Sequence, residues 1–145
     1  MAGRKHTRII AVITIALVLV ALALLWHSRP GYEVKSGFTV IEDAYRYRQT
    51  GFMAEVDGTV ARILMDDKED QRNQKFTIRL TNGQMLLVIH DQEAAGRVPV
   101  SVGDRVLVRG EYVWTETGGT LRYTQRDYSP RRLHGWIDHN GERYD

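Results

Sequence analysis

The chain has 145 residues, no cysteine and a formal net charge of +2. The lack of cysteine excludes disulfide bonds and thiolate metal ligands, so any metal would need histidine or carboxylate ligands. Four of the 20 Lys and Arg residues precede residue 30 and all 18 Asp and Glu residues follow it, which leaves residues 30–145 with a net charge of −2. Bulk charge therefore gives no argument for nucleic-acid binding.

The first predicted element is an apolar segment over residues 9–26, interrupted only by Thr14 and preceded by Arg4, Lys5 and Arg8. As a helix it would be roughly 27 Å long, close to the roughly 30 Å hydrocarbon core of a bilayer. We predict that residues 1–8 are a cytoplasmic basic flank and that residues 9–26 are a transmembrane anchor or signal segment. The protein is then a single-pass protein of the inner membrane, with its C-terminal part in the periplasm.

A cleaved signal peptide is the alternative for this segment. Residues 21–23 (Ala-Leu-Ala) have the small-x-small pattern that signal peptidase reads. Residues 24–26 (Leu-Leu-Trp) continue the apolar run beyond that point, and a Trp is typical of the interfacial end of a spanning helix. Both alternatives place the rest of the chain outside the cytoplasm.

Residues 27–37 are predicted to be a linker and residues 38–145 the extracytoplasmic domain. A short helix begins this domain, because Thr39 and Glu42 have the spacing of a capping box and Phe38, Ile41 and Tyr45 share one face. We expect this helix to end near Gly51 and to lie on a sheet.

From Gly51 onward the hydrophobic pattern has a period of two, which is typical of strands. Residues 75–81 alternate around Phe76, Ile78 and Leu80, and a turn at 81–83 leads into the apolar segment 85–89, so a hairpin is predicted. A short helical segment is expected at 92–98. A strand follows over 105–109, with a bulge or bend at Gly110, and continues over 111–115.

A turn at residues 118–119 then leads into a strand over 120–125, and Asn140-Gly141 is suited to the type I′ turn of a C-terminal hairpin. Short antiparallel strands bent at glycines, with one helical segment among them, predict a mainly β protein. The specific prediction is a small OB-like Greek-key barrel with a short N-terminal helix, preceded by one transmembrane helix.

Several short motifs resemble a family of short exported bacterial proteins, domain of unknown function family 3465. They are Gly58-Thr-Val, Leu64-Met-Asp-Asp67, Gln74-Lys-Phe76, Leu86-Leu-Val-Ile-His90, Gly103-Asp104, Gly110-Glu-Tyr-Val-Trp114, Gly118-Gly119, Asp127 and Gly135-Trp136-Ile137. The resemblance covers residues 51–144 and implies no particular activity. The family's His-Trp-Thr-His hallmark corresponds here to Arg122-Tyr123-Thr124-Gln125, so only its threonine is kept.

Cationic and aromatic residues recur on the predicted outward faces of the strands. Cations interleaved with aromatic rings on an OB-type sheet are what single-stranded nucleic acids or oligosaccharides bind, and they are equally compatible with an ordinary solvated sheet face. The candidate ligand-binding residues are Lys75, Arg79, Arg105, Arg109, Tyr112, Trp114, Arg122, Tyr123 and Arg126.

The leading functional hypothesis is an uncharacterised membrane-anchored envelope protein. It would be a non-enzymatic OB-like binding module for an anionic or glycan ligand or an envelope protein partner. No cofactor is predicted, and cytoplasmic nucleic acid is not an expected partner.

Two alternatives stay open. A metal-dependent, nuclease-like hydrolase with a degenerate histidine cluster would use the weak metal candidates His90, Asp66, Asp67 and Asp127. A haem carrier resembling the cytochrome-maturation chaperones shares the plan of an anchor followed by an OB barrel. Those chaperones have a histidine shortly before an Asp-Glu-Asn-Tyr stretch, and here residues 126–128 (Arg-Asp-Tyr) offer none.

Overall fold

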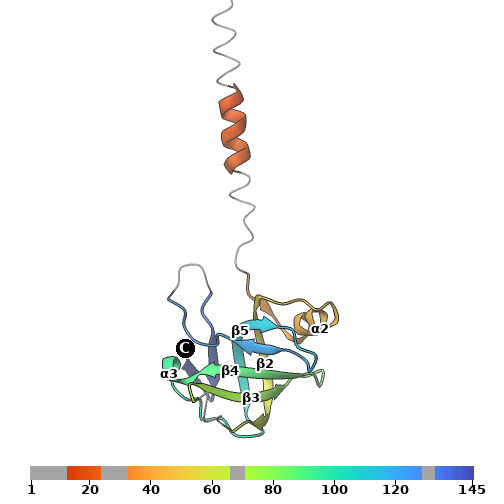
Figure 1. Ribbon diagram of the computed structural model, residues 1–145, viewed down its shortest axis with the longest axis vertical. Coiled ribbons are helices and arrows are strands. Elements are labelled where there is room, and N and C mark those ends of the chain that lie inside the picture. The colour runs from red at the N-terminus through yellow and green to blue at the C-terminus, as the bar shows by residue number, and fades with distance from the viewer. Residues whose placement is uncertain (1–12, 24–32, 66–70, 129–132) are drawn as a thin grey trace, which may run out of the picture. The chain divides into compact units, whose positions relative to one another are not determined.

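The computed structural model describes residues 13–23, 33–65, 71–128 and 133–145 (Figure 1). The chain divides into two compact units, residues 1–31 and residues 32–145. In the first unit the described residues 13–23 form a helix with exposed side chains. Among the described residues no helix has the length and apolar character needed to cross a membrane. The membrane-spanning helix predicted over 9–26 is thus not found there, and residues 9–12 and 24–26 lie outside the described ranges.

The second unit is mainly β-structure with short helices (Figure 1). Its elements in chain order are β1 (Lys35–Ser36), α2 (Phe38–Arg46), β2 (Phe52–Ile63), β3 (Asn73–Arg79), β4 (Met85–Asp91), α3 (Gln92–Ala95), β5 (Arg105–Val113), β6 (Thr120–Arg122), β7 (Trp136–His139) and β8 (Glu142–Tyr144).

Five of these strands form a closed barrel. The pairing runs β2–β3–β4–β6–β5, and β5 pairs with β2 to close the ring. All pairs in the ring are antiparallel except β4–β6, which is parallel. The remaining strands extend the sheet, since β1 pairs parallel with β2, and β7 and β8 form a hairpin beside β5. Closure leaves the ring strands with few unpaired edges.

The barrel interior is filled by residues from alternate strand positions. Phe76, Ile78 and Leu80 are buried on one side of the β3–β4 hairpin, as the period of two predicted. Val106 and Val108 point the same way from β5 and are also buried. The predicted hairpin at 75–89 is therefore confirmed.

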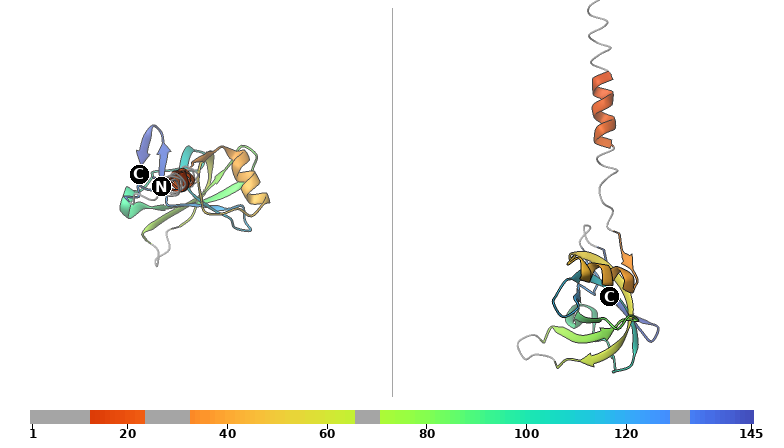
Figure 2. Two further views of the ribbon diagram at one scale, coloured as in Figure 1. Left: turned by 90° about the horizontal axis from the view of Figure 1, so that it is seen from above. Right: turned by 90° about the vertical axis from the view of Figure 1, so that its right-hand side faces the viewer.

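Helix α2 lies across one end of the barrel (Figure 2). Ile41 and Ala44 are its fully buried residues. The predicted capping box is wrong, because the N-cap is Gly37 and no side chain caps the helix. Thr39 falls inside the first turn, where its hydroxyl cannot act as an N-cap. The end of the expected linker is part of the sheet, since Lys35–Ser36 forms β1.

Gly110 is not at a bulge, so the first of the two alternatives predicted there, a bulge or a bend, is wrong. It pairs in register with Ala54 in an uninterrupted ladder, and the register shift lies in β2 between Val60 and Arg62. Glycine is needed at 110 because a Cβ would lie 2.7 Å from the carbonyl oxygen of Arg122. The C-terminal hairpin is confirmed, with φ of 52° at Asn140 and 83° at Gly141, as a type I′ turn requires.

Candidate functional site

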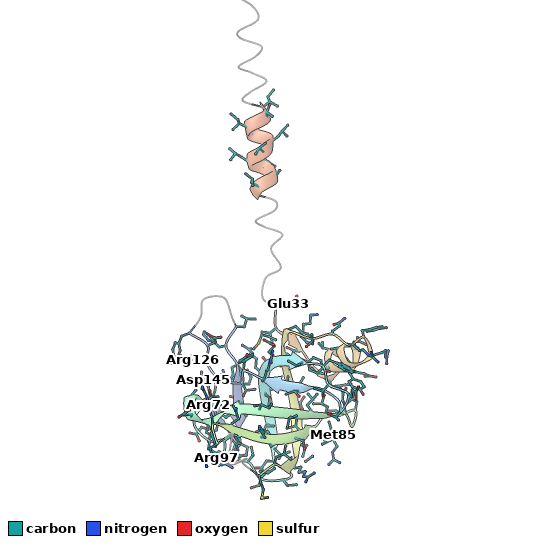
Figure 3. All side chains as sticks on the ribbon, viewed as in Figure 1. Glu33, Arg72, Met85, Arg97, Arg126 and Asp145 are labelled. Atoms are coloured by element: carbon teal, nitrogen blue, oxygen red, sulfur yellow. The ribbon has the colours of Figure 1, made fainter. Side chains whose placement is uncertain are left out.

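Most of the predicted cations on the outer faces are paired with carboxylates of neighbouring strands or of the C-terminus. The N···O distances are 2.8 Å for Arg105–Asp57, 2.6 Å for Arg109–Glu55, 2.8 Å for Arg122–Glu111 and 2.6 Å for Arg126–Asp145. Figure 3 shows Arg126 and Asp145 side by side. These pairs largely neutralise the face that the sequence predicted to be cationic.

Arg109 is the most enclosed of these arginines. Its side chain is 29% exposed, it donates through Nε and a terminal nitrogen to the Glu55 carboxylate, and it lies 4.9 Å from the Trp136 ring centroid. Arg143 lies over the same ring at 3.9 Å and pairs with Asp138 at 2.7 Å. Arg109 is therefore held by the sheet and is not available to a ligand.

The aromatic members of the predicted set are not a stacking platform. Tyr112 is fully buried, its hydroxyl donates to the Gly118 carbonyl at 3.2 Å, and burial raises its pKa to about 12. The placement of Tyr112 on a ligand-binding face is thus wrong. Tyr112 is an even number of residues from Val106 and Val108 on β5, so its side chain points to the same, inner side of the barrel. Tyr123 is half-buried and lies beneath the Arg122 guanidinium, 5.0 Å from it.

Trp114 anchors helix α2. Its indole Nε1–H donates to the Tyr45 carbonyl at 3.1 Å, the two rings stack with centroids 6.3 Å apart, and Arg48 lies 5.2 Å above the indole. The Tyr45 hydroxyl in turn donates to the Glu116 carbonyl at 3.0 Å. Trp114 therefore joins the end of β5 to the helix.

Removing the Trp114 indole should loosen helix α2 while the barrel stays folded. In Trp114→Ala the lost hydrogen bond and ring contact remove at least about 1 kcal/mol of local stability, so backbone amides of α2 should exchange with solvent roughly fivefold faster or more. Hydrogen exchange followed by mass spectrometry measures this change. Tyr128→Ala, at a side chain that is 88% exposed, is the control and should leave α2 exchange unchanged.

One predicted cation has no acidic partner among the described residues. Arg79, at the end of β3, is exposed and lines a cleft of about 420 Å³ with residues from β2, β5 and the β3–β4 turn. The other lining residues are Asp57, Gly58, Thr59, Leu80, Thr81 and Arg105. Lys75 lies four residues before Arg79 on β3. It is half-buried and does not line this cleft.

Strand register explains why two arginines meet in this cleft. Thr59 of β2 is paired with Arg79 of β3 on one side and with Arg105 of β5 on the other. Directly paired residues of an antiparallel sheet project from the same face, so the three side chains stand in one row. Both arginines were predicted as ligand-binding residues from the sequence, whereas Asp57, Thr59 and Thr81 were not. Strand pairing is the signal that places Asp57 and Thr59 here, and Thr81 follows from the β3–β4 turn.

The weak metal candidate His90 is a buried structural residue. Its Nε2 donates to the Gly96 carbonyl at 2.9 Å, and its Nδ1 lies 2.9 Å from the Thr124 hydroxyl. Both ring nitrogens are engaged, so His90 cannot offer a lone pair to a metal without breaking this network. Thr124, the retained threonine of the family hallmark, is fully buried beside it.

The other weak candidates do not join His90 in a cluster. Asp66 and Asp67 lie outside the described residues. The backbone N–H of Asp127 donates to His134 Nδ1 at 3.3 Å. In the described ranges no three His, Asp or Glu side chains converge as a metal site would require.

Acid should destabilise the barrel through His90. Burial lowers the pKa of His90 below its usual 6.5, so as pH falls the unfolded chain takes up a proton before the folded chain does. The free energy of unfolding should then fall by up to about 1.4 kcal/mol per pH unit below pH 6.5, with no contribution from His90 above it. Urea unfolding between pH 7.5 and 5.5 measures this slope. His90→Gln should flatten it, and an unchanged slope would contradict the assignment.

The fold and the site define a small closed β-barrel protein whose described outer faces carry largely paired charges and include an arginine-lined cleft. A family model described as "protein of unknown function (DUF3465)" matches residues 20–145. The chain belongs to this family, which the short motifs of the sequence predicted.

The other comparisons add little. No curated protein matches the chain. A solved structure, that of the hypothetical protein ygiW from E. coli, is similar over 61% of this chain and 82% of its own, with 15% identity and a TM-score of 0.41.

Proposed function

We propose that this protein is a non-enzymatic binding module that holds an anionic ligand in the cleft between Arg79 and Arg105. The observation that carries the proposal is Arg79, a cation with no carboxylate partner in the described part of the chain, set in a row with Thr59 and Arg105. The paired arginines elsewhere on the surface offer no comparable excess of positive charge. An anionic ligand is therefore favoured over a neutral glycan.

An OB-like barrel is the proposed architecture of this module. The ring order β2–β3–β4–β6–β5 with a single parallel pair, β4–β6, and the helix α3 between β4 and β5 support it. Barrels of this kind bind oligonucleotides and oligosaccharides on their outer strand faces and loops. The cleft lies on such a face, at the meeting point of β2, β3 and β5.

The binding proposal is tested with charged and neutral oligomers. The full chain in neutral detergent is titrated into fluorescein-labelled oligogalacturonate, a single-stranded oligonucleotide and a neutral maltooligosaccharide, with fluorescence anisotropy as the readout. We expect saturable binding of an anionic oligomer that weakens with added salt, because the contact is between exposed charges. Equal binding to the neutral oligomer, or no saturable binding at all, would overturn the proposal.

We further propose that residues 9–26 anchor the protein in the inner membrane with the barrel in the periplasm. The apolar run and the preceding Arg4, Lys5 and Arg8 support this orientation. A wild-type chain without cysteine permits a direct test, since a single introduced cysteine is the sole thiol. The exposed Glu116 and the N-terminal Ala2 give a matched pair of positions.

In intact spheroplasts a membrane-impermeant maleimide should label Glu116→Cys and spare Ala2→Cys until the membrane is permeabilised. Labelling of Ala2→Cys without permeabilisation would contradict the orientation. Release of the chain into the soluble fraction, shortened at its N-terminus, would instead support the cleaved signal peptide.

A further inference from the structure

The cleft that includes Arg79 and Arg105 has a small net positive charge. Its lining holds two guanidinium groups and one carboxylate, that of Asp57, which leaves one net positive charge. The remaining polar groups are the hydroxyls of Thr59 and Thr81, which both donate and accept hydrogen bonds. A site with one excess positive charge and neutral donors is complementary to a group that carries one negative charge.

The two arginines are spaced so that both can contact such a group, one from each side. Arg79 and Arg105 are each paired directly with Thr59, on opposite sides of β2. Paired residues on neighbouring strands have Cα atoms about 4.5–5.5 Å apart, so the two arginine Cα atoms are separated by roughly 10 Å. Their long side chains can both reach a group above Thr59, and each guanidinium can present two parallel N–H donors to a pair of oxygens.

The contact between Arg105 and Asp57 is easily exchanged. The side chains are 79% and 52% exposed, and exposed ion pairs contribute only about 0–1 kcal/mol. The pair between Arg109 and Glu55 is more enclosed, at 29% and 23%, and is reinforced by the Trp136 ring. Arg105 can therefore turn from Asp57 to a ligand, whereas Arg109 is held in place.

We infer that the cleft binds a singly charged oxyanion group, a carboxylate or a phosphodiester, between Arg79 and Arg105, and that this group replaces Asp57 as the partner of Arg105. This inference rests on the proposed function and names the ligand chemistry of the same cleft. Asp57 acts as an internal competitor. It keeps the cleft selective for one negative charge and lowers the affinity for every anion.

The test follows the arginine side chains directly. The full chain, labelled with ¹⁵N-arginine, is titrated in neutral detergent with acetate and separately with diethyl phosphate at constant ionic strength. We expect saturable shifts of the Nε–Hε signals of Arg79 and Arg105 with at least one of the two probes. The tighter probe tells a carboxylate source from a phosphodiester source. The signal of Arg62, an exposed arginine outside the cleft on the same strand β2, should stay in place.

Two variants, with a control, distinguish binding in the cleft from a nonspecific electrostatic effect of the added anions. Arg79→Gln should abolish the saturable shift of Arg105, whereas Arg62→Gln should not alter it. Asp57→Asn removes a negative charge near the bound group and should tighten binding roughly fivefold. Shifts that never saturate, wild-type binding by Arg79→Gln, or weaker binding by Asp57→Asn would each overturn the inference.

The outcomes distinguish a failure of this inference from a failure of the proposed function. If oligomer binding depends on Arg79 but neither monoanion saturates, the singly charged group is wrong and the binding module stands. If neither oligomers nor monoanions bind, the proposed function fails as well.

Discussion

Gly135→Ala should destabilise the barrel by at least about 4 kcal/mol, among the largest effects expected of a single methyl group. A Cβ at Gly135 would lie 1.9 Å from the carbonyl oxygen of Tyr123, 2.8 Å from the Cα of Thr124 and 2.9 Å from the carbonyl oxygen of Arg109. All three obstacles are backbone atoms of β5 and of the segment after β6, so no side-chain rotation relieves them. Urea unfolding followed by circular dichroism measures the change.

Gly83→Ala separates this steric effect from the general cost of losing a glycine. Gly83 lies in the β3–β4 turn with φ of 87°, and a Cβ built there would meet no atom within 4 Å. Alanine there meets only the backbone penalty of the left-handed region, about 1–2 kcal/mol. Equal destabilisation by the two substitutions would mean that the approach of the strands at Gly135 is not as tight as described.

Gln74→Glu should cost about 3 kcal/mol or more at neutral pH, the second large effect. The buried Gln74 side-chain amide pairs with the backbone of Val98 as a neighbouring strand would. Its Nε2 donates to the Val98 carbonyl at 2.8 Å, and its Oε1 accepts from the Val98 N–H at 2.9 Å. A carboxylate keeps the second bond but sets a negative oxygen against the Val98 carbonyl. The cost appears in urea unfolding at pH 7.

The pH dependence identifies the cause of this cost. Burial and the facing carbonyl should raise the folded-state pKa of the introduced carboxyl above its unfolded value, so the penalty is present at neutral pH and shrinks as pH falls toward 4. Gln49→Glu makes the same chemical change at an exposed position after helix α2 and should cost under about 0.5 kcal/mol. A penalty for Gln74→Glu that does not shrink with acid would exclude charge burial as its cause.

The sequence predicted the barrel strands well because their alternation is local. Phe76, Ile78 and Val108 are buried as their period of two required, and the Asn140-Gly141 turn has the predicted geometry. The capping box at Thr39 failed because the chain enters α2 through Gly37, in a conformation set by the pairing of β1 with β2. That pairing is a tertiary contact without a local signal.

The outer face was harder to predict, because charge pairing across a sheet depends on register. Arg109 and Glu55 are 54 residues apart in sequence, and only the β2–β5 register brings them together. The registers of β2 with β3 and with β5 together place Arg79 and Arg105 on either side of Thr59. The sequence could therefore name the arginines, but it could not tell those that are neutralised from the one that is not.

The same limit applies to residues with two possible roles. Tyr112 was assigned to a ligand face from its neighbours in sequence, although its parity along β5 equals that of the core valines. His90 was a metal candidate by residue type, and its ring is instead held between Thr124 and the Gly96 carbonyl. In both cases burial decided the role, and burial follows from closure of the ring.

The central claim is that Arg79, unpaired among the described residues, and the exposed, weakly paired Arg105 bind the ligand, and that the enclosed Arg109 does not. The most direct measurement compares dissociation constants for the anionic oligomer that binds wild type most tightly, using Arg79→Gln, Arg109→Gln and wild type in the same anisotropy assay. We predict that Arg79→Gln weakens binding at least about tenfold, as loss of a charge-assisted hydrogen-bonded contact of about 1.5–3 kcal/mol requires, and that Arg109→Gln binds as wild type. Equal binding by all three, or loss confined to Arg109→Gln, would contradict the claim.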